Sequence, residues 1–211
     1  RFPVGVIGHA AGLVLAQHAN DYQLHIANKF KRVPYDAANQ LSDFSSWGLS
    51  ADGDLKPDVT LPGGMIYSSV NNGEYYMDRG TSMASPHAAG ATALVKQALK
   101  ERFPHLSPEQ LQVLVKQMTM STAIPHVDEE THAYSSVRQQ GAGVMDVTAA
   151  ALGDLYVTAK DAKSSLTLGN VTDTFEFDVT IHNLSNQDKS VRYETTLQTD
   201  QVQDGKFTLH P

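Results

Sequence analysis

The chain has 211 residues, a formal net charge of −7 and no cysteine. This length suffices for one hydrophobic core, or for one domain together with parts of others. The negative charge argues against nucleic acid and anionic lipid as partners, and the lack of cysteine excludes disulfides, thiolate metal sites and a cysteine nucleophile. No apolar run approaches the roughly 20 residues that a transmembrane helix requires.

The first segment covers residues 1–34. We expect a short strand at residues 4–7, a short apolar helix at 10–17 and a strand at 22–26, where apolar and polar residues alternate. The chain begins within the first of these strands, without a Met or a signal-peptide pattern, and it stops without a terminal feature. Both ends are therefore expected to be cuts in a longer polypeptide.

The second segment covers residues 35–153 and holds the longest predicted helix, at 82–102. This helix is rich in small residues and carries no charge between Arg79 and Lys96, so we expect it to be buried nearly all round. Pro86 is then tolerated because it lies in the first turn, where N–H groups have no intrahelical partner, and Gly90 indicates close packing against a neighbour.

Other elements of this segment have local signals. A brief strand is predicted near residues 59–61 and another at 65–70, before a turn at Asn71-Asn72-Gly73. Ser107-Pro108-Glu109-Gln110 is a capping box that opens a helix with a buried stripe. That stripe consists of Leu111, Leu114, Val115 and Met118. A short alanine-rich helix follows Asp146 and ends near Gly153.

The third segment covers residues 154–211. Apolar residues alternate with polar ones at 175–181 and again at 191–197, which predicts two strands of an antiparallel sandwich. A typical sandwich of this kind needs about 100 residues, so the segment is expected to hold only its beginning.

Ser82 opens the long helix within Gly-Thr-Ser-Met-Ala-Ser-Pro-His-Ala-Ala-Gly, residues 80–90. A hydroxyl there lies beside free backbone N–H groups at the positive end of a helix, which are the donors that an acyl-transfer oxyanion needs. Serine is also a common helix N-cap, but the complete eleven-residue segment favours a nucleophile. Such a nucleophile needs a base, usually a histidine that a carboxylate orients.

The segment 80–90 resembles the nucleophile segment of subtilisin-like serine proteases, the subtilases. Together with residues 44–48, 56–64 and 141–151 it has the order and approximate spacing of the C-terminal half of a subtilase catalytic domain. Within that family the chain is most similar to the lactocepin-type cell-envelope proteinases of lactic acid bacteria.

The resemblance implies an α/β fold and three pieces. Residues 1–34 would be the tail of an inserted protease-associated domain. Residues 35–153 would be the C-terminal half of the catalytic domain, a mostly parallel sheet with helices. Residues 154–211 would begin a truncated, all-β fibronectin-III-like sandwich.

The resemblance also implies roles for individual residues. Ser82 would be the acylating nucleophile, with its own N–H as one oxyanion donor and the Thr81 hydroxyl supporting the same site. Arg79 and Gly80 would lie where peptide substrate crosses the nucleophile, and Phe44 would border the leaving-group side. The Asp, His-Gly-Thr and oxyanion Asn segments of the family have no counterpart here, so they are expected upstream and the chain alone is expected to be inactive.

The other candidate residues favour structural roles. His87 lies about a turn and a half along the helix from Ser82 and would point elsewhere. The loop 126–132 has metal-ligand residue types but no zinc spacing, so a solvated acidic loop is expected. Asp52 and Asp54 lack the remainder of a calcium loop. We therefore expect no metal or cofactor in this segment, although the intact protein would be able to hold structural calcium.

The resemblance thus implies part of a secreted, cell-wall-attached serine endopeptidase of a Gram-positive bacterium, acting on protein or peptide substrates. Two alternatives stay open. The protein would be a non-catalytic surface module that binds protein or cell wall, or a naturally nicked enzyme whose two chains associate.

Overall fold

The computed structural model describes the side chains and backbone of residues 9–18, 20–21, 38–129, 131–159, 162–169, 171–172 and 174–196, and the backbone of 199–203 and 206–210. The expected strands at 4–7 and 22–26 lie outside these residues. The chain divides into two units, Arg1–Ala38 and Asn39–Pro211. None of the helices in the described part is long and apolar enough to cross a membrane.

In the first unit the structure describes one helix, α1, at His9–Gln17. It matches the helix expected at residues 10–17. None of its residues is buried, and Leu13 and Val14 are both about half exposed.

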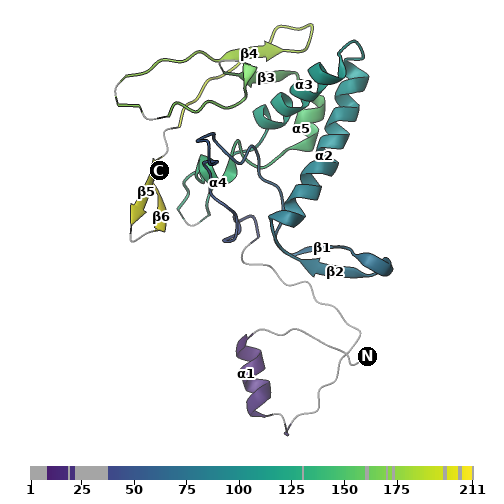
Figure 1. Cartoon of the computed structure of the whole chain (residues 1–211), viewed down its shortest axis with the longest axis vertical. Helices are drawn as coiled ribbons and strands as arrows, with labels where there is room; N and C mark the ends of the chain where they lie inside the picture. The colour runs from purple at the N-terminus through teal and green to yellow at the C-terminus, as the bar shows by residue number, and fades with distance from the viewer. Residues whose placement is uncertain are drawn as a thin grey trace. The chain divides into compact units, whose positions relative to one another are not determined.

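The core of the second unit lies between three helices, α2 at Thr81–Arg102, α3 at Pro108–Ser121 and α5 at Val147–Leu152. They lie side by side in Figure 1 and contact one another pairwise. A shorter helix, α4, covers Val137–Gln140. The buried core consists of Val95, Leu99, Leu111, Leu114, Val115, Met118, Met145 and Ala150. The stripe predicted for the second helix is therefore confirmed.

The caps of these helices follow the sequence. The side chain of Ser107 accepts a hydrogen bond from the N–H of Gln110, and the Gln110 side chain accepts one from the N–H of Ser107. This reciprocal pair is the predicted capping box. The Asp146 carboxylate caps α5 by accepting from the N–H of Ala149. Both helices begin where local hydrogen bonding satisfies their free N–H groups.

The strands of the described residues form three antiparallel pairs. β1 (Ile66–Ser69) pairs with β2 (Tyr75–Asp78), β3 (Leu155–Thr158) with β4 (Thr180–Asn183), and β5 (Thr199–Gln203) with β6 (Lys206–His210). The only parallel pairing among these residues is an isolated bridge between Thr60 and Val144. Helices and strands are thus mixed, as in the α/β class, but the expected mostly parallel sheet is not formed within the described part.

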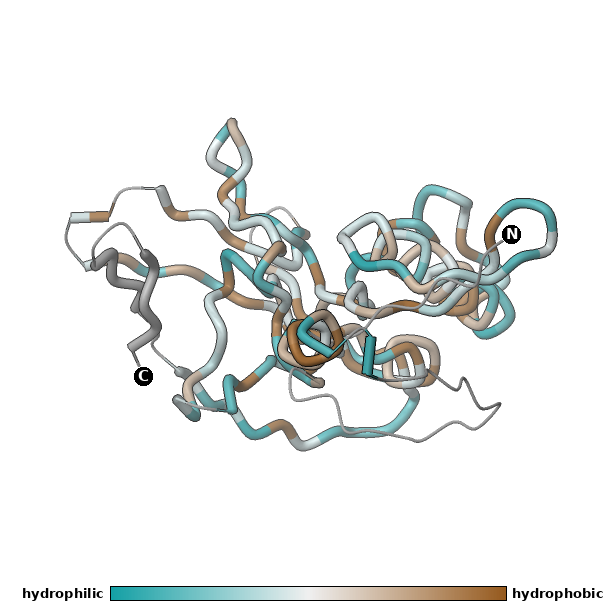
Figure 2. The backbone as a smooth tube through the Cα atoms, turned by 90° about the horizontal axis from the view of Figure 1, so that it is seen from below, coloured by the Kyte–Doolittle hydropathy of each residue, from teal (hydrophilic) through white to brown (hydrophobic). Residues whose placement is uncertain are grey.

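The C-terminal part differs from the expected strands. Among the described residues of the two predicted strands, only Thr180 and Ile181 are in a strand, β4, and its partner is β3. Residues 175–179 and 190–196 are in no strand, and Phe175 and Phe177 are about half exposed although their rings stack at 6.2 Å. Figure 2 shows hydrophobic and hydrophilic residues alternating along this part. The pattern is therefore present, but a strand also needs a partner for its backbone groups, and the described residues supply none there.

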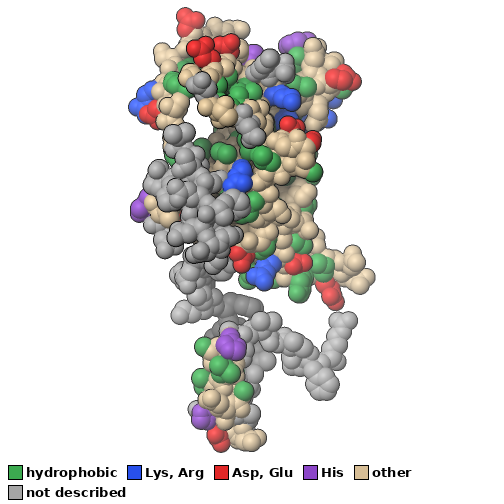
Figure 3. Space-filling model, turned by 60° about the vertical axis from the view of Figure 1, so that its left-hand side comes forward, with side chains coloured by type: hydrophobic (Ala, Val, Ile, Leu, Met, Phe, Trp, Pro, Cys, Tyr) green, Lys and Arg blue, Asp and Glu red, His purple; other side chains and the backbone are tan. Residues whose placement is uncertain are grey.

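Helix α2 is less buried than its sequence predicted. Val95 and Leu99 are its only buried residues, Leu94 is 61% exposed, and a Cβ atom on Gly90 would have no atom within 4 Å. Hydrophobic side chains appear at scattered places on the surface in Figure 3. The expected close packing at Gly90 is thus wrong for the described residues. The composition of a helix without a polar face indicates that it should be buried. The burial itself depends on other elements that pack over the helix.

Candidate active site

Ser82 lies in the first turn of α2, and its side chain is exposed. The helix begins at Thr81, one residue earlier than predicted. Gly80 is the N-cap, with φ of 150°, a conformation that favours glycine. Its carbonyl accepts hydrogen bonds from the N–H groups of Met83 at 3.0 Å and Ala84 at 3.4 Å. The N–H groups of Thr81 and Ser82 precede these bonds and have no acceptor among the described residues, so they stay available to an anion.

Pro86 is the sixth residue of α2, not a residue of its first turn as the sequence analysis expected. Because proline has no N–H, the carbonyl of Ser82 loses the helical hydrogen bond that residue 86 would otherwise donate. The backbone at Ser82 is therefore held by one fewer hydrogen bond within the helix.

The loop Pro62-Gly63-Gly64 packs against the start of α2. The N–H of Gly80 donates to the carbonyl of Gly63 at 2.8 Å, and Nδ1 of His87 donates to the carbonyl of Pro62 at 2.8 Å. A Cβ on Gly63 would lie 2.7 Å from the carbonyl oxygen of Gly80, so the contact has no room for a side chain. Sequence reasoning missed this contact, although two consecutive glycines after a proline were a signal for close backbone approach.

The remaining predicted residues surround this contact. Arg79 is exposed, and its N–H donates to the carboxylate of Asp78 at 2.8 Å. Phe44, 38% exposed, lies in a turn closed by the bond from the N–H of Ser45 to the carbonyl of Ser42. The hydroxyl of Ser42 in turn lies 3.2 Å from where a Cβ of Gly64 would be. Arg79, Gly80, Thr81 and Ser82 are neighbours in the sequence, and the turn that holds Phe44 approaches the glycine loop through Ser42.

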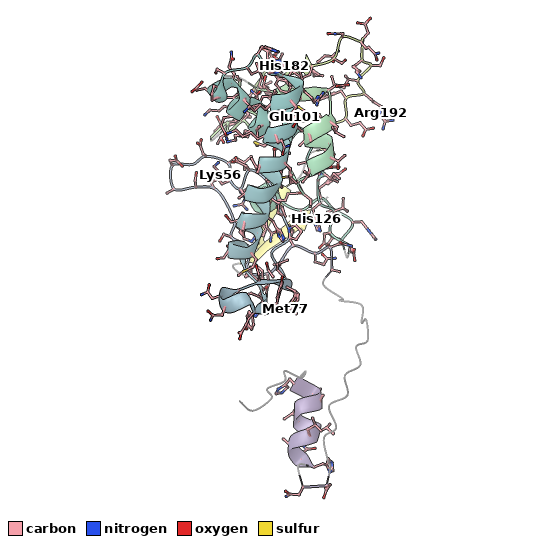
Figure 4. The ribbon with its side chains drawn as sticks, turned by 90° about the vertical axis from the view of Figure 1, so that its right-hand side faces the viewer. Lys56, Met77, Glu101, His126, His182 and Arg192 are labelled. Carbon is pink, nitrogen blue, oxygen red and sulfur yellow. The ribbon has the colours of Figure 1, made fainter. Side chains whose placement is uncertain are left out.

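Within the part of the chain that the structure describes, no histidine or carboxylate forms a hydrogen bond with the hydroxyl of Ser82. His87 uses its Nδ1 for Pro62, as a structural role requires. Figure 4 shows Met77 near the end of α2 that carries Ser82, and Glu101 at the opposite end. The described residues near Ser82 therefore supply an exposed hydroxyl and backbone donors without a base.

His126 belongs to a separate polar network that the sequence analysis did not anticipate. Its Nε2 donates to the carbonyl of Asn39 at 2.5 Å, and its Nδ1 lies 2.7 Å from the hydroxyl of Ser135. The buried side-chain amide of Gln140 bonds to the backbone of both His126 and Ser135. Both ring nitrogens of His126 are hydrogen-bonded, so His126 joins the loops around it. Among the described residues there is no group of three or more acidic, His or Cys side chains that could hold a metal ion.

Asp52 and Asp54 were the other candidates for a metal ligand. The hydroxyl of Ser50 donates to Asp52 at 2.6 Å, and this hydrogen bond is the main cause that lowers the pKa of Asp52 below its usual range. The same hydroxyl lies 3.0 Å from the backbone carbonyl of Asp54. These bonds close a local turn, and two carboxylates do not make the six to eight oxygen ligands that calcium takes.

An exposed serine at the start of a helix, beside free N–H groups, is the arrangement expected of a hydrolase that forms an acyl intermediate. The model of the subtilase family, peptidase S8, matches residues 14–170. The chain therefore belongs to the subtilase family.

Two kinds of curated relative match the chain. It is 41% identical over 212 residues to a C5a peptidase of Streptococcus pyogenes, covering all of this chain and 18% of that protein. It is 42% identical over 120 residues to the PII-type proteinase of Lactococcus lactis subsp. cremoris, covering 53% of this chain and 6% of that protein. The chain thus spans less than a fifth of the length of these relatives.

Among solved structures, the Patellamide maturation protease PatA is 27% identical, with 42% of this chain and 30% of that chain covered. The TM-score is 0.33.

Proposed function

We propose that the intact polypeptide is a subtilisin-like serine endopeptidase, and that this chain carries its nucleophile, Ser82. The observation that carries the proposal is the position of Ser82, exposed in the first turn of a 22-residue helix beside N–H groups without an acceptor. The serine would attack a peptide carbonyl, its proton would pass to a histidine base, and the acyl-enzyme would then be hydrolysed by water. The N–H of Ser82 would stabilise the oxyanion.

The base, its orienting aspartate and the oxyanion asparagine are proposed to come from parts of the polypeptide outside these 211 residues. Family membership supports this, as does the small share of its relatives that the chain covers. A serine without its base loses most of its rate, so the chain by itself should not hydrolyse casein. If the chain cleaved casein and its Ser82→Ala variant did not, the proposal that the base lies outside these 211 residues would be wrong.

The substrate-binding roles and the domain limits are part of the same proposal. Arg79, Gly80 and Thr81 would contact the peptide where it crosses Ser82, and Phe44 would border the leaving-group side. Residues 1–34 would belong to an inserted protease-associated domain, 35–153 to the catalytic domain and 154–211 to a fibronectin-III-like domain. The names of the relatives, a peptidase and a proteinase, support a protein substrate, and their organisms support a Gram-positive source. An extracellular, cell-wall-attached location is proposed together with this function.

The reaction as proposed requires no cofactor. Any structural calcium ion is proposed to be bound by other parts of the intact protein. The alternative is a surface module that binds protein or cell wall without catalysis, which the exposed apolar residues of the C-terminal part, Val179, Ile181 and Tyr193 among them, would favour.

The test is fluorophosphonate labelling of the intact protein, with a Ser82→Ala variant as the control. Labelling at Ser82, and its loss in the variant, is expected for a working protease. A correctly folded protein that does not label at Ser82 would overturn the proposal and favour the binding module.

A further inference from the structure

The start of α2 is held less firmly by its own hydrogen bonds than the rest of the helix. Pro86 cannot donate to the carbonyl of Ser82, and Gly80 is a residue with wide conformational freedom. A nucleophile must nevertheless be held within a fraction of an ångström of its productive position. The restraint must therefore come from outside the helix.

The glycine loop supplies two such restraints, one on each side of Ser82 along the chain. The N–H of Gly80 is bonded to Gly63 on the N-terminal side, and the ring of His87 is bonded to Pro62 on the C-terminal side, each at 2.8 Å. Adjacent residues of one loop thus hold two positions of α2 that enclose the serine. Both bonds end on backbone carbonyls, which a change in the loop side chains cannot remove.

The contact between the glycine loop and α2 also leaves no room for a side chain at residue 63. A Cβ on Gly63 would lie 2.7 Å from the carbonyl oxygen of Gly80 and 3.1 Å from the Cβ of Ala84. A side chain at residue 63 is therefore excluded, and the two hydrogen bonds hold the loop against the start of α2. The glycine and the two bonds together allow the close approach of the loop to Gly80.

We propose that His87 is a positioning residue for Ser82, acting through Pro62 and Gly63 on the cap of α2. The inference rests on the proposed function, since it assigns a role in the reactivity of the same serine. His87 donates from Nδ1 both as the imidazolium and as the neutral tautomer with its proton on Nδ1, so the restraint does not depend on its charge. Its role is distinct from that of a general base, which would have to accept the proton of Ser82.

The experiment measures the rate of fluorophosphonate labelling of Ser82 in the intact protein carrying His87→Ala, His87→Asn or Gly63→Ala. Loss of the hydrogen bond in His87→Ala is expected to slow labelling about tenfold. The amide of asparagine can occupy the place of Nδ1, so His87→Asn should restore most of the rate and leave its pH profile unchanged. Gly63→Ala should slow labelling similarly, because its Cβ forces the loop away from Gly80.

His105→Ala is the matched control. It is the same substitution at an exposed histidine just beyond the other end of α2, and it should label at the wild-type rate. A peptide substrate should show the loss in His87→Ala mainly in kcat, with KM little changed. Wild-type labelling by His87→Ala, or a His87→Asn protein as slow as His87→Ala, would overturn the proposal. Loss of a titration step from the pH profile of His87→Asn would do the same, since it would make His87 the base.

Hydrogen exchange separates this inference from the proposed function. The amide of Gly80 donates to Gly63, so its exchange should be faster in His87→Ala than in His105→Ala, whether or not Ser82 reacts. If the Gly80 amide exchanges faster in His87→Ala but the protein never labels, the positioning role of His87 stands and the proposed protease function is wrong. If Ser82 labels and His87→Ala changes neither the labelling rate nor the exchange of the Gly80 amide, the protease function stands and the positioning role of His87 is wrong.

Discussion

The guanidinium of Arg102 and the carboxylate of Asp154 lie 3.0 Å apart and join the last turn of α2 to the chain just after α5. The same guanidinium donates to the carbonyls of Ala151 and Gly153, at 2.8 and 3.0 Å. Lys189 donates to the second carboxylate oxygen of Asp154 at 2.9 Å. Asp154 therefore connects the helices with the segment that follows β4.

Replacement of Arg102 by alanine should loosen this junction. Three hydrogen bonds are lost, two of them to carbonyls at the end of α5, and exchange of the α5 amides should become at least about tenfold faster. Arg192→Ala is the control, since Arg192 pairs with Glu194 where both side chains are mostly exposed. Native-state hydrogen exchange measures both. Equal exchange in the two variants would show that the Arg102 contacts do not hold α5.

Asp154 should make stability depend on pH only in acid. The hydrogen bond from Lys189 lowers the pKa of Asp154 below its usual value of 3.8, attraction to Lys189 and Arg102 acts in the same direction, and desolvation opposes them. A lowered pKa stabilises the fold above the unfolded value and loses that effect as pH falls through the folded value. The difference in thermal midpoint between wild type and Asp154→Asn should thus be constant from pH 5 to 8 and shrink below about pH 3.8. A difference that changes near neutral pH would contradict this assignment.

Gly141 and Gly169 share a positive φ but differ in the space around them, and the ψ of −132° at Gly141 adds backbone strain to its steric conflict. Both have φ of 65°, but a Cβ on Gly141 would lie 2.4 Å from the carbonyl oxygen of Pro57, whereas one on Gly169 would have no atom within 4 Å. Gly169→Ala should cost about 1 kcal/mol of unfolding free energy from strain alone. Gly141→Ala should cost more than about 4 kcal/mol, or prevent folding. Similar thermal midpoints for the two variants would show that the 57–58 loop can move away.

Leu94 and Leu99 test whether other parts of the polypeptide cover α2. Leu99 is fully buried, so Leu99→Ala should cost about 2–5 kcal/mol. Leu94 is 61% exposed within this chain, where its replacement would cost less than about 0.5 kcal/mol. If the remainder of a catalytic domain packs on this face, Leu94→Ala should instead cost about 2 kcal/mol in the intact protein. Denaturant unfolding of the intact protein distinguishes the two values, and the smaller one would count against the proposed division of the catalytic domain.

Much of the local structure was predictable. The capping box at Ser107, the buried stripe of α3, the strand at 66–69 with its following turn and the helix after Asp146 all follow from residues close together in the sequence. The serine at the start of α2 was found in the same way. The strand predictions at 175–181 and 191–197 were less successful, since a strand depends on a partner that its own alternation does not identify.

The sequence alone determined the starts of α3 and α5 and placed Ser82 in the first turn of α2, because caps and helical stripes depend on neighbours a few residues away. Only the tertiary structure decided that His87 bonds to Pro62, that Gly63 touches Gly80, and that most of α2 stays uncovered within this chain. These contacts join residues far apart in the sequence. Their formation depends on how the loop and the helices pack in space, which no spacing along the chain encodes.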